Sequence, residues 1–185
     1  MIRALIFVFF FALTGCTSNE STVITKANLT KDVVIDVPLP SFSGDVKYKQ
    51  LLTTTYDEKK RSLIVFLNLY KDKLELTGVS TGFINIFKLV YDKNGVNTQY
   101  YVPKTLAPPV NQVLLDIMLC YSKSDEIKKI LNERFILEDL DTMRLIKKAN
   151  SDLVYKIDYQ LKDNKRIPLR IENKEFNYNL NIKYL

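Results

Sequence analysis

The chain has 185 residues, 46% of them hydrophobic and 26% charged, and it contains no histidine. These values are typical of one globular domain, and a net charge of +6 is too small and too dispersed to indicate a nucleic-acid-binding protein. The lack of histidine excludes Ser-His-Asp and Cys-His catalysis and histidine-based metal sites, so we expect no enzymatic activity, no metal and no cofactor.

An apolar run, ALIFVFFFAL at 4–13, opens the chain after Arg3. It is shorter than the roughly 20 residues that span a bilayer and has the length of a signal-peptide core. The next residues, LTGC at 13–16, resemble the lipobox of bacterial lipoproteins. That resemblance implies a cleaved signal peptide at 1–15 and lipidation of Cys16, and Thr17 in place of an Asp implies the periplasmic face of the outer membrane. The alternative is an uncleaved anchor with a free cysteine.

Residues 16–43 are polar and weakly patterned, so we expect a lipidated tether there and a single domain at 44–185. The alternating prolines of VPLP at 37–40 favour extended backbone at the end of this tether. Once Cys16 is lipidated, Cys120 has no disulfide partner, and its apolar surroundings in the sequence indicate an inert core residue.

The first half of the domain has the pattern of β-strands. Leu63, Val65 and Leu67 alternate with Ile64 and Phe66, which predicts a strand covered on both faces. Asn-Gly at 94–95 predicts a hairpin with a type I′ turn. The predicted strands are Tyr48–Tyr56, Arg61–Lys71, Leu74–Ser80, Phe83–Tyr91 and Val96–Val102.

Two helices are expected in the middle of the domain. The apolar positions of VNQVLLDIMLCY recur at helical spacing, which predicts a largely buried helix over Val110–Tyr121. Ser124 can cap a second, short helix over Asp125–Glu133.

Strands resume after the helices. The acidic EDLD at 138–141 lies between two strand-like runs, and we expect it to form a solvated turn. The predicted strands are Arg134–Leu137, Thr142–Lys148, Ser151–Leu161, Arg166–Ile171 and Glu175–Leu185. The predicted fold is mainly β (α+β): an antiparallel sheet of nine or ten strands that must curl, with the first helix packed as a plug in its concave face.

This order of lipobox, strands, buried helix and strands resembles the LolA/LolB-like lipoprotein fold, a half-open barrel with a helical plug. More closely, the chain resembles a family of bacterial lipoproteins of unknown function that are encoded beside aryl-polyene and fatty-acid-type synthases. The matching stretches are SLIVFL at 62–67, LELTGVSTG at 74–82, VLLDIML at 113–119 and FNYNLNI at 176–182. LolB carries an exposed Leu before the glycine that matches Gly82, whereas this chain has Thr81 there. We expect Phe83 to begin the next strand.

Asp116 is the one charged residue of the predicted helix Val110–Tyr121. It is a candidate polar contact in a ligand cavity or a latch to the sheet, and the alternative is a solvent-facing or loop-capping carboxylate. The candidate cavity residues, each of which could equally belong to the core, are Phe66, Phe87, Leu114, Met118, Tyr155 and Tyr178.

Three functions remain open. The first is an outer-membrane-anchored module that binds or hands on an acyl or polyene lipid in the half-barrel. The second is a non-catalytic accessory subunit that tethers an envelope protein partner. The third, disfavoured by the lack of histidine, is an acyl hydrolase or transferase that works through Asp, Tyr or Lys.

Overall fold

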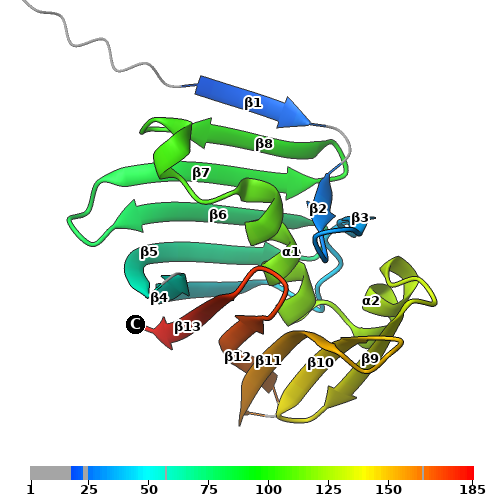
Figure 1. Cartoon of the computed structure of the whole chain (residues 1–185). Coiled ribbons are helices and arrows are strands. Elements are labelled where there is room, and N and C mark those ends of the chain that lie inside the picture. Colours follow the sequence, from blue (N-terminus) through cyan, green and yellow to red (C-terminus); the bar gives the residue numbers. More distant parts are fainter. Residues whose placement is uncertain (1–17, 23–24, 57, 164) are drawn as a thin grey trace, which may run out of the picture.

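Neighbouring strands in the chain pair with one another because short turns connect them. The computed structural model describes residues 18–22, 25–56, 58–163 and 165–185. Eleven described strands form one antiparallel sheet in the order β1-β8-β7-β6-β5-β4-β13-β12-β11-β10-β9, and β2 and β3 form a separate pair (Figure 1). The strands are β1 (Ser18–Thr22), β2 (Lys26–Asn28), β3 (Val34–Asp36), β4 (Val46–Tyr56), β5 (Lys59–Tyr70), β6 (Lys73–Ser80), β7 (Asn85–Asp92), β8 (Gly95–Tyr100), β9 (Phe135–Leu140), β10 (Met143–Lys148), β11 (Leu153–Lys162), β12 (Lys165–Asn173) and β13 (Tyr178–Tyr184).

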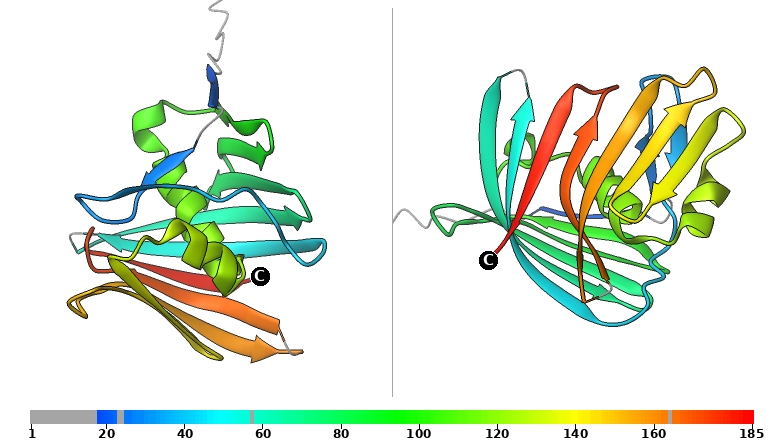
Figure 2. Two further views of the ribbon diagram at one scale, coloured as in Figure 1. Left: turned by 90° about the vertical axis from the view of Figure 1, so that its right-hand side faces the viewer. Right: turned by 90° about the horizontal axis from the view of Figure 1, so that it is seen from below.

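The large sheet bends into two walls with a helix between them. Helix α1 (Val110–Tyr121) lies in the concavity, and the shorter α2 (Ser124–Ile130) follows it near β9 (Figure 2). A short 3-10 turn, η1 (Lys104–Leu106), precedes α1. The predicted class, a curved antiparallel half-barrel with a helical plug, is confirmed, and α1 has the predicted bounds.

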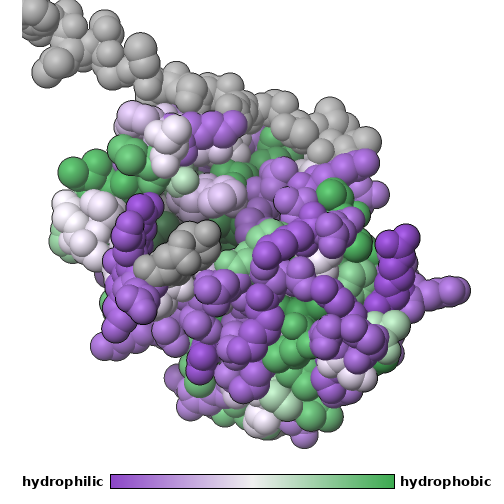
Figure 3. Space-filling view, in the orientation of Figure 1, coloured by the Kyte–Doolittle hydropathy of each residue, from purple (hydrophilic) through white to green (hydrophobic). Residues whose placement is uncertain are grey.

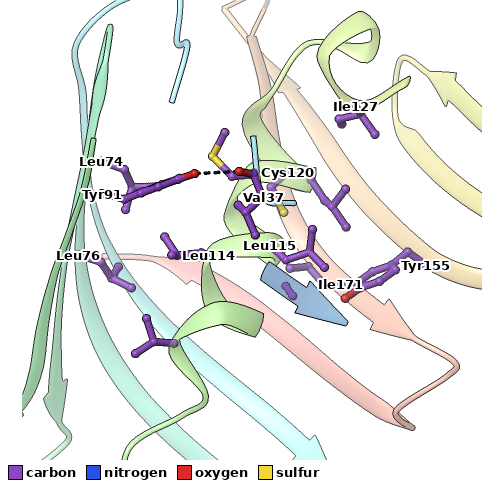
Figure 4. Close-up of a cluster of buried hydrophobic side chains, with 14 of the residues drawn as sticks. Val37, Leu74, Leu76, Tyr91, Leu114, Leu115, Cys120, Ile127, Tyr155 and Ile171 are labelled. Atoms are coloured by element: carbon purple, nitrogen blue, oxygen red, sulfur yellow. Dashed lines mark hydrogen bonds between the residues drawn. The ribbon is translucent and has the colours of Figure 1, made fainter. Parts of the chain in front are cut away.

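The core packs one face of α1 against the sheet. Leu114, Leu115 and Met118 on α1 are fully buried against aliphatic residues of the strands (Figure 4). Each such side chain contributes roughly 1.5–3 kcal/mol relative to leaving it exposed. The hydroxyl of Tyr91 donates to the carbonyl of Val37 at 2.8 Å, which ties the N-terminal segment to the inner face of β7.

The N-terminal segment differs from the predicted tether over 16–43. Strand β1 pairs with β8 from Ser18↔Tyr100 to Thr22↔Val96, and Leu29 and Phe42 are buried. The folded unit therefore begins before residue 44. The pattern was missed because β2 and β3 have only three residues each, with one buried side chain apiece, too few for an alternation to be visible. Cys16 and the predicted signal peptide lie outside the described residues.

Three local predictions are corrected. The β7–β8 hairpin exists, but its two-residue turn is Lys93-Asn94, and Gly95 follows it with φ 100°, as in a type I turn with a bulge rather than type I′. Helix α2 begins at Ser124, preceded by Lys123 as N-cap, and its Ser124 hydroxyl bonds Asp139 instead of capping the helix. Phe83 lies in the β6–β7 turn with φ 63° and is 77% exposed, so it does not begin β7.

Candidate functional site

A cavity of about 620 Å³ lies between α1 and the concave face of the sheet. The side chains of β5 that point inward supply one wall, because alternate residues of a strand face the same side. The volume falls within the range of roughly 300–1,000 Å³ that small-molecule sites occupy. Its walls are mainly apolar, and they include Leu52, Leu63, Val65, Phe87, Ile117 and Leu180. On the face of the molecule that Figure 1 presents, Figure 3 shows hydrophobic residues in the depth between hydrophilic ones.

One polar cluster interrupts the apolar wall at the middle of α1. The hydroxyl of Tyr178 donates to both carboxylate oxygens of Asp116, at 2.7 and 2.8 Å. The hydroxyl of Tyr155 donates to Oδ1 of Asp116 at 3.2 Å, and the amide of Gln112 donates to Tyr155 at 2.5 Å. The cluster joins α1 to β11 and β13, and Asp116, Gln112 and Tyr178 also line the cavity.

Asp116 has an unusual protonation equilibrium. Burial raises the pKa of its carboxyl group to about 7, although the hydrogen bonds from Tyr178, Gln112 and Tyr155 act in the opposite direction. Burial also raises the pKa of Tyr155 and Tyr178 well above the ordinary tyrosine value, so both remain hydrogen-bond donors at neutral pH. A carboxyl group that titrates near neutral pH in a cavity wall is a feature typical of functional sites.

A second polar cluster holds the C-terminal end of α1. Arg144 donates to the carbonyls of Leu119 and Ser122 at 2.5 and 3.1 Å, and it forms an ion pair with Asp139 at 2.6 Å. Arg166 contacts the same carboxylate at 2.6 Å. Asp139 therefore lies in a buried ion network within β9, and the predicted solvated turn at 138–141 is wrong for this residue.

The structure separates the six candidate cavity residues. Phe87 and Tyr178 line the cavity. Leu114, Met118 and Tyr155 are fully buried in the core, Tyr155 with its hydroxyl directed to Asp116. Phe66 was wrongly assigned: it is 42% exposed on the outer face of β5, where the Lys49 ammonium lies 5.9 Å from its ring centroid. Because side chains alternate along β5, Phe66 faces away from Leu63 and Val65, and this period-2 pattern is the sequence signal that excludes Phe66 from the cavity.

Asp116 was a candidate polar contact in a ligand cavity, but its hydrogen-bond partners were not predicted. Gln112 carries no sequence signal, because a single polar residue on an amphipathic helix is ordinary. A further group was also missed at Tyr121, the last residue of α1. It consists of Gln50, Tyr121 and Tyr184, joined by hydrogen bonds of 3.2 Å. Both clusters bring together residues more than 20 positions apart in the chain, which periodicity cannot detect.

The described residues contain no group of three or more His, Cys, Asp and Glu side chains that could hold a metal ion. Burial raises the pKa of the Cys120 thiol, which keeps it protonated. None of the helices in the described part of the chain is long and apolar enough to span a membrane.

Residues 47–185 match the family described as "Protein of unknown function (DUF3261)". The chain belongs to this family. The matched region runs from β4 to the C-terminus, so it contains every residue that lines the cavity except Asn28. A search of curated proteins gave no match. For this member of the family, an open curved sheet with an apolar cavity is compatible with ligand binding.

Proposed function

We propose that the protein is a lipid-anchored, periplasmic outer-membrane lipoprotein that binds or hands on an acyl or polyene-type chain. The cavity between α1 and the sheet carries this proposal. Its volume of about 620 Å³ and its largely apolar walls suit a flexible hydrocarbon chain better than a sugar, nucleotide or peptide. The half-barrel with a helical plug is also the architecture that the resemblance to LolA and LolB implies.

An exposed apolar turn supports contact with a lipid surface. Phe83 and Ile84 in the β6–β7 turn are 77% and 63% exposed. The neighbouring strand β5 begins with exposed KKR at 59–61, and Leu63 pairs with Ser80, which places this basic segment at the same end of the sheet. Apolar side chains beside basic ones favour an anionic bilayer. With the predicted lipid at Cys16, such a turn would be a second membrane contact.

The proposal is tested by filling the cavity. Leu63→Trp places a larger side chain in the cavity wall, whereas Phe66→Trp makes a similar change on the outer face of the same strand. We expect Leu63→Trp to weaken binding of an uncharged fluorescent fatty-alcohol probe at least about tenfold, and Phe66→Trp to change it less than about twofold. Native mass spectrometry of wild-type protein from cells should detect a co-purifying lipid. Equal probe binding by both variants, with no lipid detected, contradicts the proposal.

A second candidate function is a tethering subunit for an envelope protein. Strand β9 is one edge of the eleven-stranded sheet, and its Ile136 and Leu140 are 44% and 54% exposed. An edge strand with exposed apolar residues can pair with a strand of another protein. Crosslinking from a photoreactive residue at position 136 should then recover one defined protein, and substituting Ile136→Lys should abolish the crosslink from position 140.

A further inference from the structure

We propose that the cavity selects chains whose end is a hydrogen-bond donor, such as a hydroxyl or an amine, over chains that end in an anion, and that Asp116 determines this selectivity. This inference rests on the proposed function, because it names the class of chain that the cavity takes. It follows from the hydrogen-bond donors around the Asp116 carboxylate and from the lack of a cation beside it among the described residues.

The carboxylate has capacity for one more donor. A carboxylate offers about four lone-pair positions. Three side chains donate to it: the hydroxyls of Tyr178 and Tyr155, with one proton each, and the amide of Gln112. Asp116 belongs to the cavity wall, so a polar group of a ligand in the cavity can lie beside this residue. A hydroxyl or amine at the end of an apolar chain would complete the set.

No cation compensates Asp116 among the described residues. The groups that face it are Gln112 and Cys120 on α1, Tyr155 on β11 and Tyr178 on β13, and all are neutral at neutral pH. Arg144 and Arg166 are engaged by Asp139 instead. An anionic ligand end would therefore meet an unneutralised carboxylate in apolar surroundings, where repulsion is strong.

Protonation of Asp116 should weaken the discrimination. Because burial raises the pKa of this carboxyl to about 7, the group is mainly neutral in mildly acidic solution and mainly charged in mildly alkaline solution. The two tyrosines have raised pKa values and do not lose their protons in that range. The preference against anions should therefore grow as the pH rises through about 7.

The experiment compares two ligands with the same chain, dodecanol and dodecanesulfonate, by displacement of an uncharged fluorescent fatty-alcohol probe. The sulfonate stays ionised throughout, so only the protein titrates. Wild-type protein at about pH 8 should bind dodecanol at least about tenfold more tightly than dodecanesulfonate, and Asp116→Asn should reduce this ratio to within about threefold. Thr54→Val changes a polar wall residue outside the Asp116 cluster and should leave the ratio unchanged.

The wild-type protein supplies a second measurement that does not depend on the folding of a variant. Its ratio should fall at least about threefold between about pH 8 and about pH 5.5, because Asp116 becomes neutral. A ratio near one in wild-type protein at about pH 8, or an equal ratio in Asp116→Asn and Thr54→Val, would overturn the inference while leaving the proposed function intact. If the uncharged fluorescent probe did not bind and neither dodecanol nor dodecanesulfonate bound, the proposed function itself would be overturned.

Discussion

Two aspartates attach α1 to the sheet region, and they do so in opposite electrostatic settings. Asp139 lies against Arg144 and Arg166, at 2.6 Å from each guanidinium. Asp116 is surrounded by the hydroxyls of Tyr155 and Tyr178 and has no cationic partner among the described residues. Burial acts to raise the pKa of both carboxyl groups, but the hydrogen bonds from Arg144 and Ser124 help hold the pKa of Asp139 at about 2 whereas that of Asp116 rises to about 7.

The difference separates a structural cluster from a candidate functional one. Through Arg144, the Asp139 network satisfies the buried carbonyls of Leu119 and Ser122 at the end of α1, and Tyr159 adds a longer contact of 3.5 Å to Leu119. In the Asp116 cluster, the carboxyl group lies in the wall of a cavity, and burial destabilises its charged form. A protein that needed only a latch for α1 could use neutral groups there, so the carboxylate favours a role in ligand selection.

The largest expected effect comes from breaking the Asp139 network. Arg144→Met removes one of the two arginines that pair with Asp139 and the donor to the carbonyls of Leu119 and Ser122 at the end of α1. We expect the free energy of unfolding to fall by about 3–5 kcal/mol, because two buried carbonyls lose the Arg144 donor and Asp139 keeps only Arg166 as an ion partner. Urea unfolding monitored by circular dichroism measures this.

The matched control lies on the same strand. Lys147 pairs with Glu138 at 2.7 Å, but both side chains are substantially exposed. Lys147→Met should therefore cost less than about 1 kcal/mol. Similar losses for the two variants would show that the Arg144 network is no more important than a surface ion pair.

The pH dependence of stability should have opposite signs at the two aspartates. The unfolded-state pKa of Asp is about 3.9. Because the folded pKa of Asp116 is raised to about 7, its stabilising contribution is complete below about pH 4 and is lost as the pH rises to about 7, a loss of roughly 2–4 kcal/mol. Because the pKa of Asp139 is lowered to about 2, its contribution is present above about pH 4 and is lost as the pH falls through about 2.

Urea midpoints measured from about pH 2 to about pH 8 test both signs. Asp116→Asn should flatten the decline between about pH 4 and about pH 7 and leave the acid side unchanged. Asp139→Asn should flatten the acid side only. If Asp116→Asn kept the wild-type decline, the unusual protonation of Asp116 would be disproved.

The smallest expected effect comes from removing one hydroxyl. Tyr178→Phe deletes both contacts of that hydroxyl with Asp116, so the pKa of Asp116 should rise further and the stability at about pH 8 should fall by about 1–2 kcal/mol. Carbon NMR of the Asp116 carboxyl measures the pKa. Tyr184→Phe is the control, because its hydroxyl bonds Tyr121 and the Pro168 carbonyl instead, and it should leave the pKa of Asp116 unchanged.

Much of the fold could be predicted from local pattern, and the site only in part. The strand β5 and the helix α1 were found because their side chains alternate at fixed periods over ten or more residues. β2 and β3 were missed because three residues are too few for a period. Phe66 was misplaced because its aromatic character alone does not say which face of a strand it occupies. Asp139 was misplaced because an acidic residue between two apolar runs gives the same sequence pattern in a strand as in a turn.

The sequence by itself determined the class of the fold, the position of the helical plug and the absence of histidine chemistry, since these follow from periodicity and composition. The tertiary structure alone decided which aspartate has arginine partners and which faces the cavity. Asp116 lies 39 residues from Tyr155 and 62 from Tyr178, and Asp139 lies 27 from Arg166. A pKa depends on burial and on neighbours within a few ångströms, and for these two residues the curling of the sheet around α1 selects those neighbours.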